Sequence, residues 1–149
     1  MVALPTIILM AGILETSLLM FKESVLESAT RAAAREVRTG QVQSSANATG
    51  TFKAAFCASL VAFPCTAFFF DVRTFPDFPQ IAIPAPTVDQ NGNPTNLAFA
   101  PGGPGTVVSV RVYTNHTFMT PLIGMMLGGS SQSLLISSTA IMKTEPFGG

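Results

Sequence analysis

The sequence has few charged residues and few polar aromatic ones. Of its 149 residues, 8 are Lys or Arg and 8 are Asp or Glu, which gives 11% charged residues and a formal net charge of zero. Ordinary globular chains carry roughly 25% charged residues. The chain contains no Trp, one Tyr and one His. A neutral chain lacks the field that attracts nucleic acid, so we expect no nucleic-acid partner.

The residue types that enzymes use for catalysis are also scarce. His116 is the only histidine, and the surrounding YTNHTF predicts that it is an exposed residue in a turn. One His and two spaced Cys do not supply the three or four ligands of a zinc site. The glycine pairs at 102–103 and 128–129 lack the following Lys-Ser/Thr of a phosphate-binding loop. We therefore expect no catalytic residue, no metal, no cofactor and no enzymatic activity.

Apolar residues are abundant instead, and they are concentrated at the amino terminus. Residues 1–21 (MVALPTIILMAGILETSLLMF) contain no charged side chain before Glu15. A helix rises about 1.5 Å per residue, so this run would span roughly 30 Å, the thickness of the hydrocarbon core of a bilayer. The run lacks the basic n-region and the small-residue cleavage site of an ordinary secretory signal. It predicts a helix that lies in a membrane or among helices of its own kind.

Two residues of this run are candidates for helix contacts. A carboxylate at bilayer depth costs on the order of 3 kcal/mol or more unless it is protonated or paired. We therefore expect Glu15 to lie near the membrane surface, or to pair with a cation of a neighbouring subunit, or to be held protonated in a helix contact. Gly12 is a position at which another helix can approach closely.

From Lys22 to Gly40 the same helical pattern becomes amphipathic, so we expect one helix over residues 1–40. Gly40 is suited to end it in a left-handed conformation. The alanines of the apolar arc make a thin face that suits close packing on a sheet. Phe21 and Val25 on this arc are further candidates for helix contacts. The arc consists of Leu18, Phe21, Val25, Leu26, Ala29, Ala32, Ala33 and Val37.

Residues 41–149 form the second predicted unit, a small domain of one short helix and several strands. TFKAAFCASLVAF predicts a helix over 51–63 that Thr51 caps and Pro64 follows. Alternating side chains predict strands at about 66–75, 106–113 and 133–143. In the second strand, Val108, Val110 and Val112 are expected to face the core, and Ser109, Arg111 and Tyr113 to face outward.

The two cysteines, Cys57 and Cys65, are separated by seven residues. This spacing is typical of one short-loop disulfide, which persists in proteins outside the reducing cytoplasm. The alternative is a pair of free, buried thiols. A bridge would pin the short helix to the element that follows it.

Two further segments are predicted to lie at the surface or at subunit contacts. Residues 76–105 are rich in Pro, Gly and Asn, and we expect a long excursion with a short strand at 80–83 and a turn at Asn91–Gly92. Residues 118–129 (FMTPLIGMMLGG) are too short to span a bilayer and too interrupted for a good helix. They are either buried core or an exposed subunit-contact loop. The contact candidates in this loop are Phe118, Met119, Leu122, Met125 and Met126.

These elements predict an α+β fold. The long helix would lay its second half across an antiparallel sheet of three or four strands and leave its first half protruding as an anchor. One disulfide would hold the small domain together.

Several sequence segments carry a resemblance to a known family. The most specific are ALP…GILE in the apolar run and the R-x-x-R-T-G-Q motif at 35–41. Together with FKAAFCASL, the second cysteine at position 65, DVRTFPDF, PGGPGTVVSVRVY and LLISSTAIMKTEPF, they cover nearly the whole chain. In these segments the chain resembles the TadE-like pseudopilins of the tight-adherence branch of type IV pilus systems, especially alphaproteobacterial members.

The resemblance implies a pilin-like structural subunit of a Tad-type pilus or of its assembly platform. The hydrophobic helix would cross the inner membrane once and later pack among other pilin-like subunits or copies of itself. The carboxyl-terminal domain would lie in the periplasm, outside the cell or in a cell-surface filament, and the pilus assembly machinery would be a partner. The family's basic leader and the glutamate before its hydrophobic run are not in this sequence, and Glu15 matches the family's mid-helix glutamate.

The residues alone also fit a single-span accessory subunit of another membrane protein complex, with Glu15 and residues 118–126 as its contacts. Basic residues follow the apolar run, and the positive-inside rule taken by itself would place the domain in the cytoplasm. These residues are Lys22, Arg31, Arg35 and Arg38.

Overall fold

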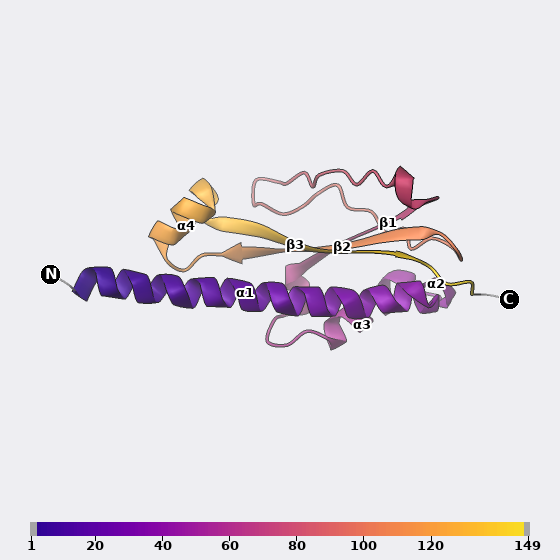
Figure 1. Ribbon diagram of the computed structural model, residues 1–149, viewed down its shortest axis with the longest axis horizontal. Coiled ribbons are helices and arrows are strands. Elements are labelled where there is room, and N and C mark those ends of the chain that lie inside the picture. The colour runs from indigo at the N-terminus through magenta and orange to yellow at the C-terminus, as the bar shows by residue number, and fades with distance from the viewer. Residues whose placement is uncertain (1–2, 148–149) are drawn as a thin grey trace.

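The computed structural model describes residues 3–147, the side chain of Ser130 excepted, and it confirms the α+β fold. Residues 1–2 of the first predicted unit and residues 148–149 of the second lie outside the described residues. Figure 1 shows one long helix beneath a small sheet. The helices are α1 (Ala3–Arg38), α2 (Gln41–Ser44), α3 (Ala48–Ala58) and α4 (Pro121–Leu127). The strands are β1 (Phe68–Phe75), β2 (Val107–Thr117) and β3 (Ser133–Lys143), and short 3-10 turns occur at Cys65–Ala67, Phe78–Gln80 and Gly129–Ser131.

The sheet is antiparallel with the order β1-β2-β3. Val110 of β2 lies opposite Val72 of β1 and Ala140 of β3. The predicted strand at 106–113 was too short, since β2 continues to Thr117, which pairs with Ser133. His116 therefore belongs to a strand and is partly buried, so its predicted place in an exposed turn was wrong.

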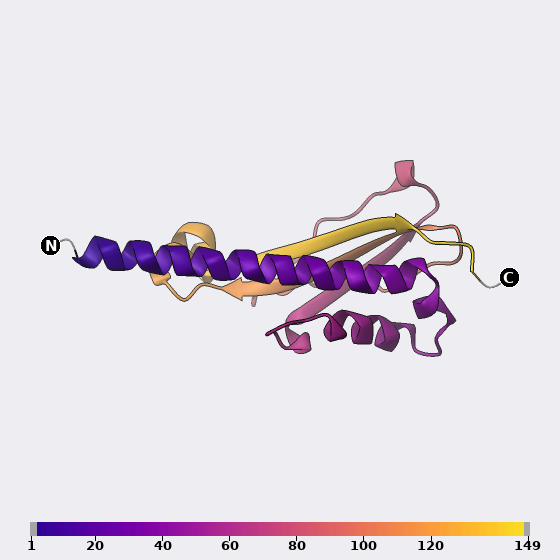
Figure 2. The same ribbon diagram turned by 60° about the horizontal axis from the view of Figure 1, so that its bottom comes forward.

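Three layers make up the molecule. Helices α1 and α3 lie side by side against one face of the sheet, as Figures 1 and 2 show from two directions. The connection between β1 and β2 covers the opposite face. The amino-terminal part of α1 extends beyond the sheet, with α4 beside it.

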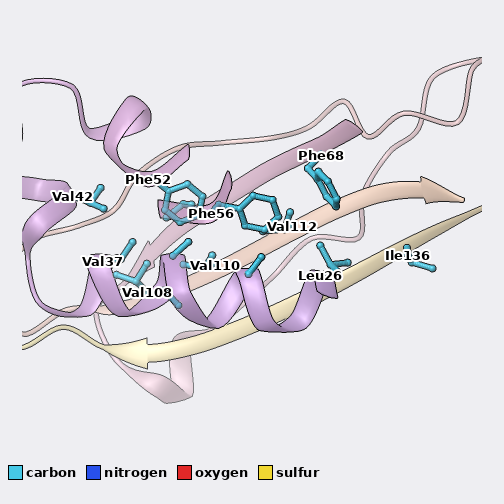
Figure 3. Packing of buried hydrophobic residues seen from close by; sticks show 14 residues of the cluster. Leu26, Val37, Val42, Phe52, Phe56, Phe68, Val108, Val110, Val112 and Ile136 are labelled. Carbon is cyan, nitrogen blue, oxygen red and sulfur yellow. The ribbon is translucent and has the colours of Figure 1, made fainter. Parts of the chain in front are cut away.

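The core lies between the helices and the sheet (Figure 3). Phe52 and Phe56 of α3 are fully buried, and their rings meet β1 edge-on, with centroids 5.5 Å from Phe70 and 5.2 Å from Phe68, respectively. Small residues on α1 let its backbone approach the sheet closely, as expected. The buried apolar residues of α1 are Leu26, Ala29, Ala33, Ala34 and Val37.

The buried stripe of α1 is rotated from the predicted arc. Leu18 and Phe21 are half exposed, at 50% and 46%, although the helical wheel places them on the apolar face. Glu15 and Thr30 are buried instead, and the Lys22 ammonium donates a hydrogen bond to the backbone oxygen of Asn115. Backbone groups of residues 115–120 satisfy Glu15 and Lys22, and the Thr30 hydroxyl donates to the Leu26 oxygen of α1 itself. Polar residues can therefore lie on the packed side of the helix.

Helix α3 begins and ends earlier than the predicted helix at 51–63. It begins at Ala48, because the side chain of Asn47 accepts a hydrogen bond from the Gly50 N–H at 2.9 Å and caps the helix. It ends at Ala58. The predicted disulfide is confirmed: Cys57 and Cys65 are bonded, and this bond joins the end of α3 to the turn that precedes β1.

The excursion between β1 and β2 packs back onto the sheet. Asp71 on β1 is buried, forms ion pairs with Arg73 and Arg111, and accepts a hydrogen bond from the Ala98 N–H. Arg111 also donates to the Pro84 oxygen at 3.0 Å. This covering layer buries Ser109 and Tyr113, so the expectation that they face solvent was wrong.

Within the excursion the turn at Asn91–Gly92 is present. Gly92 has a φ of +79°, and the Asp89 N–H donates to the Asn93 oxygen at 2.9 Å. The predicted strand at 80–83 is absent. The 3-10 turn Phe78–Gln80 includes the first residue of that segment, and Pro79 directly before it cannot donate a ladder hydrogen bond.

Candidate functional site

The most distinctive surface of the molecule is the amino-terminal half of α1. An 18-residue window of this helix has a mean hydropathy of 1.8, and only 6% of it is buried within the structure. Helix α1 is thus long and apolar enough to cross a membrane, and the low burial separates it from the core helix of a soluble protein. Its exposed apolar side chains are Leu4, Ile7, Ile8, Leu9, Met10, Ile13, Leu14, Leu18, Met20 and Phe21.

Helix α4 enlarges this apolar surface. The sequence argument against a helix at 118–129 was wrong, because Pro121 occupies the first turn, where its missing N–H is harmless, and Gly124 is buried against Phe118 and Gln132. Burial divides this segment, and its contact with other subunits stays a prediction. Phe118 is buried, whereas the other four contact candidates are exposed: Met119, Leu122, Met125 and Met126.

Glu15 links α1 to the segment that leads into α4. Glu15 is 4% exposed, and its carboxylate accepts hydrogen bonds from the backbone N–H groups of Met119 and Thr120. Thr120 precedes the first residue of α4, and its own side chain does not cap that helix. Glu15 therefore supplies the acceptor that the start of α4 lacks locally. These partners are backbone amides of the same chain. The expected place of Glu15 near a membrane surface, or its pairing with a neighbouring subunit, stays a prediction.

The other predicted contact residues have neighbours from the same chain. A Cβ added at Gly12 would lie 3.4 Å from the Ile123 side chain, so the element that approaches this glycine is α4. The Phe21 ring lies 5.9 Å from the Phe63 ring, and Val25 is partly buried. Contacts of these residues with other subunits remain predictions.

One apolar groove lies beside α4 and another beside the segment that leads into it. One, of about 500 Å³, runs between α1 and the far end of α4, and its lining includes Leu9, Ile13 and Met126. The other lies at the start of α4 and includes Leu14, Leu18 and Met119. Among residues 3–147, no group of three or more His, Cys, Asp or Glu is placed to hold a metal ion. The candidate site is therefore this apolar surface, to which we refer as the α1–α4 surface.

The sequence analysis missed a polar contact between Lys22 and Asn115 at the edge of the α1–α4 surface. Lys22 donates to the Asn115 oxygen, and His116 of the same strand stacks edge-on against Phe118, with ring centroids 5.0 Å apart. Burial lowers the pKa of Lys22. Glu15 and Lys22 are seven residues apart and therefore share one face of a helix. This spacing was the available sequence signal that both side chains face the same neighbouring segment.

Comparisons with protein-family models, with curated proteins and with solved structures give no match. The geometry therefore carries the functional argument: an exposed apolar helix half, joined to a small disulfide-bonded α+β domain, with no described cluster of ligating side chains.

Proposed function

We propose that the chain is a pilin-like structural subunit of a Tad-type pilus or of its assembly platform. In this role the first half of α1 crosses the inner membrane and later packs against other pilin-like subunits or copies of the same chain. The α+β domain lies on the periplasmic or extracellular side. The pilus assembly machinery is the expected partner.

One observation carries this proposal: the two halves of α1 have different surroundings. The second half packs on the sheet and on α3 through Leu26, Ala33 and Val37. The first half, from Ala3 to about Phe21, is apolar and largely uncovered. A helix of this kind needs lipid or other apolar helices as its surroundings, and a pilin-like subunit uses both in turn.

The disulfide also supports a domain outside the cytoplasm. Disulfides persist in oxidising compartments and are rare in the cytosol. The Cys57–Cys65 bond joins α3 to the start of the sheet, so it would stabilise a small domain that leaves the cytoplasm. This observation favours the resemblance-based orientation over the one that the positive-inside rule gives.

Cysteine crosslinking in filament-producing cells tests the proposal. The two native cysteines are bonded to each other, so Ile7→Cys introduces a unique thiol on the exposed face of α1. We expect oxidation to give adducts of Ile7→Cys with itself or with another pilin-like subunit, in material that copurifies with filaments. Lys53→Cys, on the exposed side of α3, is the matched control and should give no such adduct.

Adducts of Ile7→Cys exclusively with proteins unrelated to pilins would contradict the proposal. They would instead identify a single-span accessory subunit of another membrane complex.

A further inference from the structure

The position of α4 along α1 fixes its depth relative to a membrane. Lys22 is the first basic residue of the chain, and its ammonium is held at the Asn115 oxygen, which places the polar boundary of the anchor near this pair. Gly12 and Glu15 precede Lys22 by ten and seven residues, or about 15 and 10 Å along the helix axis. Ile123 packs at Gly12 and Thr120 bonds to Glu15, so α4 lies at that level.

The grooves beside α4 lie along the apolar half of α1. The first α1 residue that lines either groove is Leu9, and the last is Met20. Both lie within the stretch from Leu4 to Phe21, which holds the exposed apolar side chains of this helix. If this stretch crosses the membrane with the contacts that the structure shows, the level of α4 lies inside the hydrocarbon core.

The composition of the α4 region is compatible with that depth. From Thr117 to Met142 the chain contains no ionisable side chain. Apolar side chains are exposed on α4 and on the segment that leads into it, since Met126 lines one groove and Met119 the other. Lipid acyl chains can cover both grooves.

Several backbone groups around α4 are also satisfied internally, as a low-dielectric environment requires. The amides of Met119 and Thr120 bond to Glu15, and the Phe118 N–H donates to the Gln132 oxygen at 3.0 Å. At the other end, the Gly128 N–H donates to the Gly124 oxygen at 2.7 Å. Glu15 in turn would enter the membrane with its hydrogen-bonding partners already in place.

We infer that α4 is a second membrane-embedded element: it lies beside α1 in the half of the bilayer nearest the folded domain, with its exposed side chains against lipid acyl chains. This inference rests on the membrane-anchored part of the proposed function and not on its filament part. It enlarges the anchor from one helix to the α1–α4 surface.

Fluorescence quenching by brominated lipids tests the inference on the full chain. The sequence has no Trp, so each introduced Trp is a unique reporter. Met126→Trp reports on α4, and Met119→Trp reports on the segment that leads into it. Leu9→Trp reports on α1, and Val88→Trp reports on the distant excursion; all four residues are exposed. Each variant is placed in phosphatidylcholine vesicles whose acyl chains carry bromine at a defined depth.

We expect Met126→Trp and Met119→Trp to lose fluorescence to an extent comparable with Leu9→Trp, while Val88→Trp keeps its fluorescence. Quenching of Leu9→Trp without quenching of either α4 variant would overturn the inference and leave the membrane anchor in place. Protection of the α4 variants that increases with the protein-to-lipid ratio would show that a second copy covers α4, which also contradicts the inference. Absence of quenching at Leu9→Trp would contradict the membrane anchor itself.

Discussion

The carboxylate of Glu15 accepts the backbone N–H of Thr120 at 3.2 Å to each of its oxygens, across 105 residues of sequence. This contact joins the middle of the apolar run to the first turn of α4. It removes an acceptor-only charge from the exposed surface of α1 and supplies an acceptor to backbone amides that have none nearby.

Removal of the Glu15 carboxylate should loosen α4 selectively. Glu15→Ala leaves the partly buried amides of Met119 and Thr120 without this acceptor, which costs less than the roughly 1–3 kcal/mol of a fully buried group. Hydrogen exchange in detergent micelles should therefore become faster at these two amides and in α4. Glu15→Gln keeps one acceptor oxygen and should give an intermediate rate.

Thr16→Ala is the control for this experiment, because the Thr16 hydroxyl bonds only to the Gly12 oxygen of its own helix. It should leave exchange in α4 unchanged. Equal exchange rates in wild type and Glu15→Ala would show that the carboxylate does not hold α4.

Loss of the Asp71 charge should release the excursion from the sheet. Asp71→Asn leaves the largely buried Arg111 without its anionic partner, a change that typically costs about 3 kcal/mol or more. Proteolysis between residues 84 and 98 should accelerate, since Arg111 and Asp71 bond to Pro84 and Ala98 of that segment. Asp77→Asn, at an exposed position, should change neither stability nor cleavage. Unaltered cleavage of Asp71→Asn would contradict this role.

The disulfide should contribute measurably to the stability of the domain. Cys57 and Cys65 are separated by 8 positions in sequence, and closing a loop of this size is worth about 2–3 kcal/mol in the chain-entropy description. The double variant Cys57→Ala, Cys65→Ala should lose about that much unfolding free energy in chemical denaturation. Reductant should destabilise wild type and leave the double variant unaffected; a wild type that is insensitive to reductant would be inconsistent with a structural bridge.

His116 should make stability depend on pH in the mildly acidic range. Burial lowers its pKa below the ordinary value of 6.5, the Lys22 ammonium lowers it further, and the Glu15 carboxylate opposes this shift. The unfolded chain therefore takes up a proton before the folded chain does, and the free energy of unfolding should fall as the pH drops below about 6.5.

Denaturation of wild type and His116→Gln between about pH 7.5 and 5.5 checks this sign, because Asp and Glu titrate mostly below that range. The variant should show a smaller decrease than wild type. A wild type that becomes more stable on acidification would contradict the assigned environment of His116.

Local sequence patterns were sufficient for the main elements. The uninterrupted helical period gave α1, alternation gave three strands, and the cysteine spacing gave the disulfide. The bounds of β3 agree with the predicted 133–143, because its alternating residues Leu134, Ile136, Ala140 and Met142 all pack toward the core.

The errors arose where distant segments meet. The helical wheel of α1 could not show that Glu15 and Lys22 face backbone groups of residues 115–120. The predicted position of the buried stripe on α1 was therefore wrong. Nor could alternation show that the excursion covers Ser109 and Tyr113. The α4 helix was missed because the partner of its first turn, Glu15, lies on another element.

The most direct test of the central claim is the water accessibility of the first half of α1 in the assembled protein. Ile13→Cys, on the exposed apolar face, and Lys53→Cys, on the exposed side of α3, are each treated with a water-soluble maleimide in permeabilised membrane preparations. The account predicts that Lys53→Cys is labelled and Ile13→Cys is protected until the protein is denatured. Equal labelling at both positions without denaturant would show that this helix lies in water, and would contradict the account.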